Sequence, residues 1–252
     1  MPSNIIKIFK FNMIPKIIHY CWFGRRPKPQ KVLGYIETWK KYFPDFEIKE
    51  WNEDNFDINM MPYTKEAYFA KKYAFVSDVA RLYALNKCGG IYFDTDIRVL
   101  KRFSDDLLNS DGFLGFEHEQ YVTTGVMASN TNNALLEEIF SNYLVRRFFS
   151  GFKYDETTNV SFITNFFKSK GLVCDNKMKY FKGFVFLPQV YLCANDWRTK
   201  RLYNNNDTYT IHEFSYTWGN SSRLRKRIVQ LLTILKYQIR YEYNSKIDEK
   251  DI

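Results

Sequence analysis

Residues 88–99 read Cys-Gly-Gly-Ile-Tyr-Phe-Asp-Thr-Asp-Ile-Arg-Val, and this stretch decides the fold. A long helical pattern ends at the two glycines, and glycine is the residue that most readily takes the positive φ found just past a helix C-terminus. The next three residues are β-branched or aromatic, which is the composition of a buried strand. The stretch therefore predicts a helix, a tight turn and a short buried strand that ends at Asp94.

Two carboxylates, Asp94 and Asp96, follow this strand. Side chains alternate along a strand, so we expect both carboxylates on one face while Thr95 points away. Neighbouring carboxylates repel each other, and a bound Mn²⁺ or Mg²⁺ relieves that repulsion. Open α/β sheets also bind their ligands at the carboxyl ends of strands. The pattern favours a metal or diphosphate site, although an Asp-x-Asp alone also fits a solvated surface turn.

The first part of the chain has the β-α-β order of a nucleotide-binding α/β sheet. Residues 14–20 predict a strand, residues 30–42 an amphipathic helix, and residues 46–51 a second strand. The sequence holds no glycine-rich dinucleotide motif and no P-loop motif. These observations predict a nucleotide-binding α/β domain without dinucleotide or P-loop chemistry.

Residues 64–88 are strongly helical and predict two helices, the second beginning near Ser77 as its N-cap. Asp78 and Arg81 lie three residues apart on that helix and share a face. One interpretation is a surface ion pair of small energetic value. The other places both side chains in the crevice beside Asp94, because the helix leads directly into the Asp-x-Asp strand.

The later part of the chain alternates between predicted strands and helices. We expect strands at 113–116, 122–128, 184–187 and 209–212, and helices at 135–144 and 159–169. His118 and Glu119 fall in a loop that we expect to be exposed. His212 ends the last of these strands, where a histidine is often only a hydrogen-bonded surface residue.

Composition limits the classes of protein and partner. The chain has 252 residues, 19% of them aromatic, and a formal charge of +9, so it can bury a large core and favours an anionic partner. Its four cysteines are scattered without a C-x-x-C pair, which predicts free thiols in a reducing cytoplasm. No apolar run reaches the roughly 20 residues that a spanning helix needs. We therefore expect a protein that is soluble or peripheral on a membrane.

Residues 220–252 differ from the rest because apolar and basic residues interleave at helical spacing. The apolar positions are Leu224, Ile228, Leu231, Leu232, Leu235 and Ile239, and the basic ones are Arg223, Arg225, Lys226, Arg227, Lys236 and Arg240. This pattern predicts a basic amphipathic helix that packs on the domain or, as we favour, lies on an anionic membrane through residues 220–246. The predicted organisation is an appendage at 1–12, a catalytic domain at 13–219 and this helix and tail at 220–252.

Several stretches together resemble glycosyltransferase family 32, the Asp-x-Asp sugar-binding group of capsular-polysaccharide transferases and mannosyltransferases. The stretches that carry the resemblance are residues 14–24, 51–53, 74–82, 89–96, 211–212 and Trp218, in that order. The resemblance spans residues 13–219 and implies a GT-A fold, which is one Rossmann-like nucleotide-binding α/β domain with a mixed central sheet. It implies metal-dependent, retaining transfer of a hexose from a nucleotide-sugar, with UDP-sugars favoured, in bacterial capsule or surface polysaccharide synthesis.

The resemblance also implies roles for individual residues. Trp22 would stack on the base with Tyr20 beside it, Asp78 and Arg81 would hold the donor sugar, and Trp218 would lie in a loop that closes over the donor. The catalytic set implied in this way is Asp94, Asp96 and Arg81, the metal set is Asp94, Asp96 and His212, and Thr95 is counted with the donor-binding residues. The usual Ser-Trp pair of the family reads Thr217-Trp218 here.

The implied partners are a nucleotide-sugar, a glycan or lipid-linked glycan acceptor and Mn²⁺ or Mg²⁺, with no nucleic acid. The implied location is the cytoplasm, at the inner face of the plasma membrane. Two other interpretations remain open at this point. A haloacid-dehalogenase-like phosphatase also places Asp-x-Asp after an apolar strand, but Arg98 stands where that motif has Thr or Val. A non-enzymatic basic module would bind membrane or nucleic acid through the tail, and would leave the Asp-x-Asp unexplained.

Overall fold

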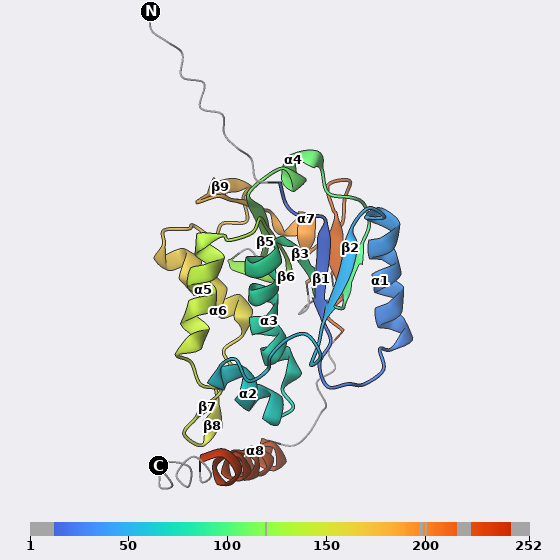
Figure 1. Cartoon of the computed structure of the whole chain (residues 1–252). Coiled ribbons are helices and arrows are strands. Elements are labelled where there is room, and N and C mark those ends of the chain that lie inside the picture. Colours follow the sequence, from blue (N-terminus) through green and yellow to red (C-terminus); the bar gives the residue numbers. More distant parts are fainter. Residues whose placement is uncertain (1–12, 119, 197–198, 200, 216–222, 243–252) are drawn as a thin grey trace, which may run out of the picture.

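The computed structural model describes residues 13–118, 120–196, 199, 201–215 and 223–242. The strands of its main sheet are β1 (Ile17–Cys21), β2 (Glu47–Trp51), β3 (Gly90–Phe93), β5 (Gly112–Glu117), β6 (Tyr121–Ser129), β9 (Lys179–Phe181) and β10 (Phe184–Leu187). Within the described residues these seven strands lie in the order β2-β1-β3-β6-β5-β10-β9 (Figure 1). The predicted α/β class with a mixed central sheet is confirmed.

The directions of the strands bring several carboxyl ends to one edge of the sheet. β1 pairs in parallel with β2 and with β3, and β5 pairs in parallel with β10. β6 runs antiparallel between β3 and β5, so β3 and β5 point the same way. The ends of β1, β3 and β5 therefore face the same side, as expected for the GT-A fold that the family resemblance implies.

Helices cover both faces of the sheet (Figure 1). They are α1 (Gln30–Tyr42), α2 (Pro62–Phe69), α3 (Tyr73–Cys88), α4 (Asp105–Leu108), α5 (Ala134–Leu144), α6 (Asn159–Ser169), α7 (Gln189–Leu192) and α8 (Arg223–Tyr237). α3 packs on β1 and β3, with α2 and α5 against it, and α6 packs on β6. α1 lies on the opposite side of the sheet.

The short strand β3 shows why both faces are covered. All four of its residues are buried. Tyr92 packs into the core beneath α3, α5 and α6, while Ile91 and Phe93 pack into the second core with Trp39 of α1. A strand that is apolar on both faces needs a layer of structure on each side.

The helix that precedes β3 begins earlier than its sequence suggests. α3 starts at Tyr73, and Ser77 lies inside its second turn, where its hydroxyl donates to the Tyr73 carbonyl at 3.1 Å. The prediction of Ser77 as N-cap is therefore wrong, because a mid-helix serine can bond to the carbonyl four residues back. The predicted helix end is correct: Gly89 follows Cys88 with φ of 62°.

Among the residues that the structure describes, two small pairs of strands lie outside the main sheet. β4 (Ile97–Val99) and β11 (Thr210–His212) pair antiparallel, with His212 opposite Ile97. β7 (Phe149–Ser150) and β8 (Lys153–Tyr154) form a short hairpin between α5 and α6. The β4–β11 pair matters most here, because it brings His212 next to the Asp-x-Asp turn.

The C-terminal helix α8 packs against the hairpin, and a π-turn at Gln238–Glu242 follows it. Tyr237 is buried, with ring centroids 5.3 Å from Phe69 of α2 and 5.0 Å from Phe149 of β7. In the part of the chain that the structure describes, no helix has the length and apolarity to cross a membrane. The predicted appendage at residues 1–12 lies outside the described residues.

One loop prediction is wrong. We expected His118 to be exposed, but its side chain is only 9% exposed and its Nδ1 lies 3.8 Å from Oδ1 of Asp196. The reason is that β5 continues to Glu117 inside the domain, so the residue after it is still enclosed. Glu119 lies outside the described residues.

Candidate active site

The Asp-x-Asp motif lies in a turn at the carboxyl end of β3. The Asp94 N–H donates to the Gly125 carbonyl at 2.8 Å, and the Ile97 N–H donates back to the Asp94 carbonyl at 3.0 Å. The second bond closes a four-residue turn between β3 and β4. The expectation that the two carboxylates share one face of a strand is therefore wrong, since the chain has already left the sheet at Asp94.

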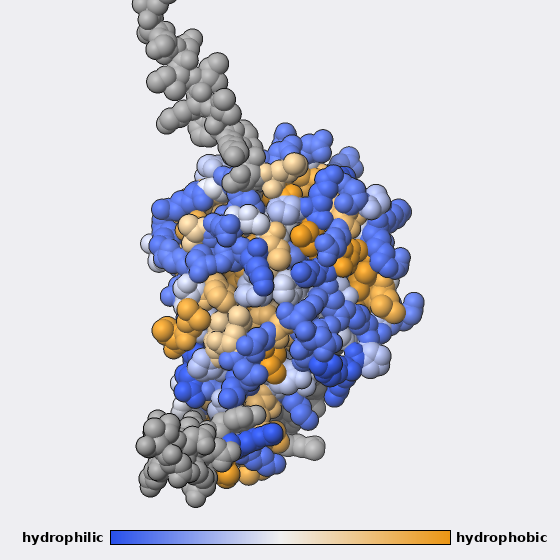
Figure 2. All heavy atoms as spheres, in the orientation of Figure 1, coloured by the Kyte–Doolittle hydropathy of each residue, from blue (hydrophilic) through white to orange (hydrophobic). Residues whose placement is uncertain are grey.

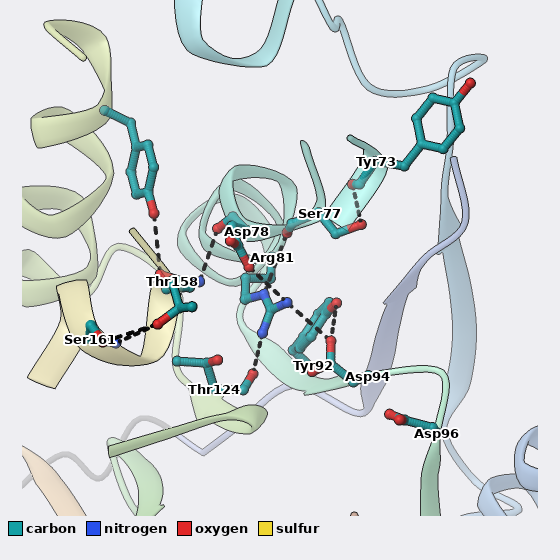
Figure 3. A network of polar contacts seen from close by, with 12 residues as sticks. Tyr73, Ser77, Asp78, Arg81, Tyr92, Asp94, Asp96, Thr124, Thr158 and Ser161 are labelled. Atoms are coloured by element: carbon teal, nitrogen blue, oxygen red, sulfur yellow. Dashed lines mark hydrogen bonds and ion pairs between the residues drawn. The ribbon is translucent and has the colours of Figure 1, made fainter. Parts of the chain in front are cut away.

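Arg81 of α3 joins two of the predicted site residues (Figure 3). Its Nη2 lies 3.1 Å from Oδ1 of Asp78 and 3.1 Å from Oδ1 of Asp94. Its Nη1 donates to the Thr124 carbonyl at 2.6 Å. The Tyr92 hydroxyl adds a bond to Asp94 Oδ1 at 2.9 Å. These contacts fix the position of one Asp94 oxygen through a rigid, charge-assisted network.

This network is buried, which excludes the interpretation of Asp78 and Arg81 as a surface ion pair. The side chains of Arg81 and Asp78 are 6% and 12% exposed, so the pair is not a surface ion pair. Burial raises the pKa of Asp78 to about 6, although the Arg81 guanidinium opposes the rise. Perturbed carboxylates in clefts are typical of functional sites, and also of structural ion pairs.

Asp96 lies outside the Arg81 network and pairs with His212. His212 Nε2 lies 3.1 Å from Asp96 Oδ1, and the Ser215 N–H donates to Asp96 Oδ2 at 2.8 Å. Burial opposes both charges, but Asp96 raises the pKa of His212 well above its ordinary value, and His212 lowers the pKa of Asp96. Each group therefore favours the charged form of the other.

Gly125 of β6 is the point at which the two halves of the site meet. A Cβ on this residue would lie 3.2 Å from Asp94 Oδ2 and 3.1 Å from His212 Nδ1. Because glycine has no Cβ, the space next to Gly125 stays open. Asp94 Oδ2 and His212 Nδ1 both border this space. Of the predicted metal set, Asp94 and His212 therefore both lie next to Gly125, and Asp96 pairs with His212.

The donor atoms at this position fit a hard divalent cation. Among the residues that the structure describes, His212 Nδ1 and Ser215 Oγ are buried without a hydrogen-bond partner. Next to Gly125, a carboxylate oxygen of Asp94 and the His212 imidazole nitrogen are ligands that Mn²⁺ accepts, and Mg²⁺ accepts the oxygen. Ser215 was not predicted from the sequence, and its separation from Asp96 along the chain explains why.

The predicted base-stacking corner lies after β1, at the same edge of the sheet. Trp22 is half-buried, and its Nε1 donates to the Arg26 carbonyl at 2.6 Å. Tyr20 is buried, and its hydroxyl donates to Glu50 at 2.5 Å. Lys28 also pairs with Glu50 at 2.5 Å. The structure thus places Trp22 at the rim of the edge and turns Tyr20 toward the second core.

Two further observations concern residues of the site. Glu117 ends β5 at the same edge as Asp94 and is 7% exposed, and burial raises the pKa of its carboxyl group. The sequence predicted this strand but did not predict Glu117 as a site residue. Its position could have identified it, because open α/β sheets bind ligands at the carboxyl ends of their strands. Trp218, the predicted loop residue, lies outside the described residues.

Comparisons with known proteins bear on the same region. A family model described as a glycosyltransferase sugar-binding region containing a DXD motif matches residues 29–114, which include Asp78, Arg81, Asp94 and Asp96. Inositol phosphoceramide mannosyltransferase 3 from Schizosaccharomyces pombe is 28% identical over 133 residues, which is 51% of this chain and 37% of that protein. The aligned region thus spans little more than a third of the relative's length. Both matches confirm the resemblance that the motifs predict.

Several solved structures resemble the chain. Among them, PaToxG glycosyltransferase has a TM-score of 0.46 and 20% identity, over 64% of this chain and 70% of that one. A glycosyltransferase involved in glycosylation of the major capsid of PBCV-1 has a TM-score of 0.44 and 10% identity, over 86% of this chain and 99% of that one.

Proposed function

Because residues 29–114 match a glycosyltransferase sugar-binding region, we propose that this protein is a metal-dependent glycosyltransferase of the family 32 type. The observation that carries the proposal is the convergence of Asp94 and His212 on the space above Gly125, with Asp96 paired to the same histidine. A phosphatase interpretation has no comparable support, because the matched region is a sugar-binding one.

The donor is a nucleotide-sugar, and we prefer a UDP-hexose. A bound Mn²⁺ or Mg²⁺ would be held by Asp94, Asp96 and His212 and would supply Lewis-acid stabilisation of the departing diphosphate. Trp22 at the rim of the sheet edge would stack on the base. Asp78 would bind hydroxyl groups of the donor sugar, and Thr95, Tyr20 and Trp218 complete the proposed donor-binding set.

The positive charge of Arg81 first suggests that it binds the donor, but its contacts indicate that it positions Asp94. Its guanidinium bonds to Asp78, Asp94 and the Thr124 carbonyl, all within the protein. We therefore propose Arg81 as a positioning residue that holds Asp94 at the angle needed for the cation and the donor. Because the transfer retains the anomeric configuration in this proposal, the leaving phosphate can take the acceptor proton and no separate base is required.

The acceptor is a glycan or a lipid-linked glycan in bacterial capsule or surface polysaccharide synthesis, at the cytoplasmic face of the membrane. The relative from Schizosaccharomyces pombe is named as a mannosyltransferase of inositol phosphoceramide, which is a sphingolipid. That name supports a hexose donor and a lipid acceptor. The C-terminal helix gives independent support for a membrane location.

Helix α8 presents an apolar stripe to solvent. Ile228, Leu231, Leu232 and Leu235 of α8, and Ile239 of the π-helix that follows it, are each at least 39% exposed. At about 100° per residue the four residues of α8 fall within an arc of about 100°, while the buried Ile234 lies outside that arc and the buried Tyr237 lies on the opposite side. Arg227 and Lys236 flank the stripe, and Figure 2 shows orange and dark blue residues together along this helix. We propose that the stripe enters an anionic lipid surface.

The first test is thermal denaturation of the purified protein with UDP and GDP, each with Mn²⁺ or with EDTA. A nucleotide at about 100 times its Kd should stabilise the fold by about 2.7 kcal/mol. We expect stabilisation by UDP that requires Mn²⁺ and is lost in Asp96→Asn. Asp105→Asn, which changes an acidic residue of α4, is the matched control and should keep the response. If no nucleotide stabilises the folded wild-type protein, the proposal is wrong.

A further inference from the structure

A second group of ligating side chains lies beside the Asp-x-Asp turn. Glu117, Cys193 and His212 each offer one ligand atom, and these atoms lie within 4.8 Å of one another. The residues come from the end of β5, from the segment after α7 and from the end of β11. Three separate elements therefore deliver a carboxylate, a thiol and an imidazole to one place.

The group is enclosed and one of its atoms has no partner. Cys193 is fully buried and Glu117 is 7% exposed. Of the atoms in the described chain, His212 Nδ1 is one of the few buried nitrogens without a hydrogen bond, while the other ring nitrogen pairs with Asp96. A ligating histidine typically has this arrangement, with a carboxylate on one nitrogen and the metal on the other.

We propose that Glu117, Cys193 and His212 form a zinc site, which shares only His212 with the oxygen-rich Asp-x-Asp site. A thiolate and an imidazole select Zn²⁺ over Mn²⁺ or Mg²⁺, which prefer oxygen ligands. Around a tetrahedral zinc ion these ligand atoms stand roughly 3.5 Å apart, so a small inward movement of the side chains completes the geometry. A water supplies the fourth ligand, and Asp94 Oδ2 lies near the same face of Gly125 as His212.

Binding releases protons, because zinc takes a thiolate and a neutral imidazole nitrogen. The Cys193 thiol gives up its proton to solvent, and His212 binds the ion through Nδ1 without a proton there while Nε2 keeps the bond to Asp96. The ligands then carry two negative charges, from the thiolate and Glu117, which balance the charge of the ion. No oxidation or reduction occurs.

The two sites share His212, which gives the zinc site a consequence for catalysis. If the proposed transferase uses His212 to hold Mn²⁺, then zinc at Cys193 removes that ligand, and zinc inhibits transfer. This consequence depends on the proposed function. The zinc site itself does not, so its test needs no transferase activity.

The test uses Co²⁺ as a spectroscopic substitute for Zn²⁺ in the full chain, with a phosphine reductant that keeps the thiols free. Cobalt bound to a thiolate gives a charge-transfer band in the near ultraviolet, which oxygen and nitrogen ligands do not give. We expect this band in the wild-type protein, its displacement by one equivalent of Zn²⁺, and its loss in Cys193→Ser. Cys174→Ser changes a cysteine outside the group and should keep the band.

Zinc affinity, measured by competition with a chromophoric chelator, should fall at least about tenfold in Glu117→Gln. X-ray absorption at the zinc edge of the wild-type protein should show one sulfur near about 2.3 Å, a result that needs no variant to fold. A zinc shell of oxygen and nitrogen only, or a cobalt–thiolate band that persists in Cys193→Ser, overturns the proposal. If the protein binds zinc through Cys193 but Zn²⁺ leaves Mn²⁺-supported transfer unchanged, then His212 is not shared between the two metal sites. That result would leave the proposed zinc site itself supported.

Discussion

Arg81 is the residue on which the buried charges of the site depend. Its guanidinium lies between two carboxylates, so Arg81→Met leaves Asp78 and Asp94 close together without a cation. Removing one partner of a buried ion pair costs roughly 3–5 kcal/mol of unfolding free energy. We expect a loss of this size at pH 7 in urea denaturation. The loss should shrink at pH 5, because protonation of Asp78 removes one of the repelling charges.

Arg102→Met is the matched control for that variant. Arg102 pairs with Asp45 through two hydrogen bonds, but both side chains are more than one third exposed. Exposed pairs contribute little to stability. If both variants lose the same unfolding free energy, the buried network is not what makes Arg81 important.

His19 gives the protein a pH dependence that has no connection with catalysis. Its ring is buried, with Nε2 2.7 Å from the Gly89 carbonyl and Nδ1 accepting from Trp51 Nε1 at 3.1 Å. The tryptophan N–H can only donate, so Nδ1 must stay unprotonated and the ring neutral. Burial lowers the pKa of His19 from 6.5 to about 4, although the bond to Gly89 opposes this.

The sign of the effect follows from linkage. The folded pKa of His19 lies below the unfolded value, so its contribution is fully present above about pH 6.5 and is lost as the pH falls toward 4. Between pH 7 and pH 5 the wild-type protein should lose about 2 kcal/mol from this group alone. In His19→Gln that part of the loss should be absent, as measured by urea denaturation at both pH values. Equal losses in the two proteins would contradict the assignment.

At the scale of elements, β6 shapes the site through Gly125. In Gly125→Ala the added Cβ would lie 3.1 Å from the His212 ring and 3.2 Å from Asp94 Oδ2, tighter than ordinary contact. We expect the variant to fold but to bind Mn²⁺ and nucleotide at least about tenfold more weakly, because the methyl group occupies the space between the two ligands. Calorimetric titration of Mn²⁺ and UDP measures this.

Gly34→Ala in α1 is the control, because a Cβ there meets nothing within 4 Å. Alanine is the better helix former, so this variant should gain roughly 0.5–1 kcal/mol of stability and bind ligands as the wild-type protein does. Unchanged binding in Gly125→Ala would show that the space above Gly125 is not part of the site.

The elements that the sequence predicts well are those with a local signal. Apolar periodicity located α1, α5 and α6, and the apolar run after Gly89 located β3, since burial of one face or both leaves its pattern in the residues themselves. The start of α3 was missed because Ser77 has the chemistry of a cap in a position that is helical. The turn at Asp94–Ile97 was missed because long-range pairing of β4 with β11, not local propensity, draws the chain out of the sheet.

The same reasoning applies to the site. Asp78, Arg81, Asp94 and Asp96 lie within a short stretch that leads from one helix to the next strand, so their proximity could be inferred from the sequence. His212 was identified only through the family resemblance. Gly125, Ser215 and Cys193 carry no local signal of function, because what matters is the distance across the fold to Asp94, Asp96 and His212.

At the scale of the whole molecule, we expect α8 to determine whether the protein binds to membranes. We expect the full chain to sediment with vesicles that contain phosphatidylglycerol and much less with neutral phosphatidylcholine vesicles, with binding weakened by salt. Leu232 and Leu235 are half-exposed members of the stripe. Replacing both with glutamate should reduce vesicle binding at least about tenfold, because each change removes apolar burial and adds a repelled charge.

Val145→Glu is the control for charge alone. Val145 is 86% exposed at the C-terminal end of α5 and is not a member of the stripe. This variant should bind vesicles like the wild-type protein. Equal binding by the double glutamate variant would contradict the membrane proposal, and a concentration-dependent dimer that the double variant abolishes would instead identify the stripe as a contact between copies.

The pairing of β4 with β11 also has a consequence for how the protein is made. Synthesis runs from the amino terminus, so the ribosome delivers Asp94 and Asp96 long before it delivers His212 and Ser215. A nascent chain can form β1, β2 and β3 early, yet its two acidic residues must wait until His212 and Ser215 have been synthesised. Incomplete chains released before that point would therefore carry the Asp-x-Asp motif without the partners of Asp96.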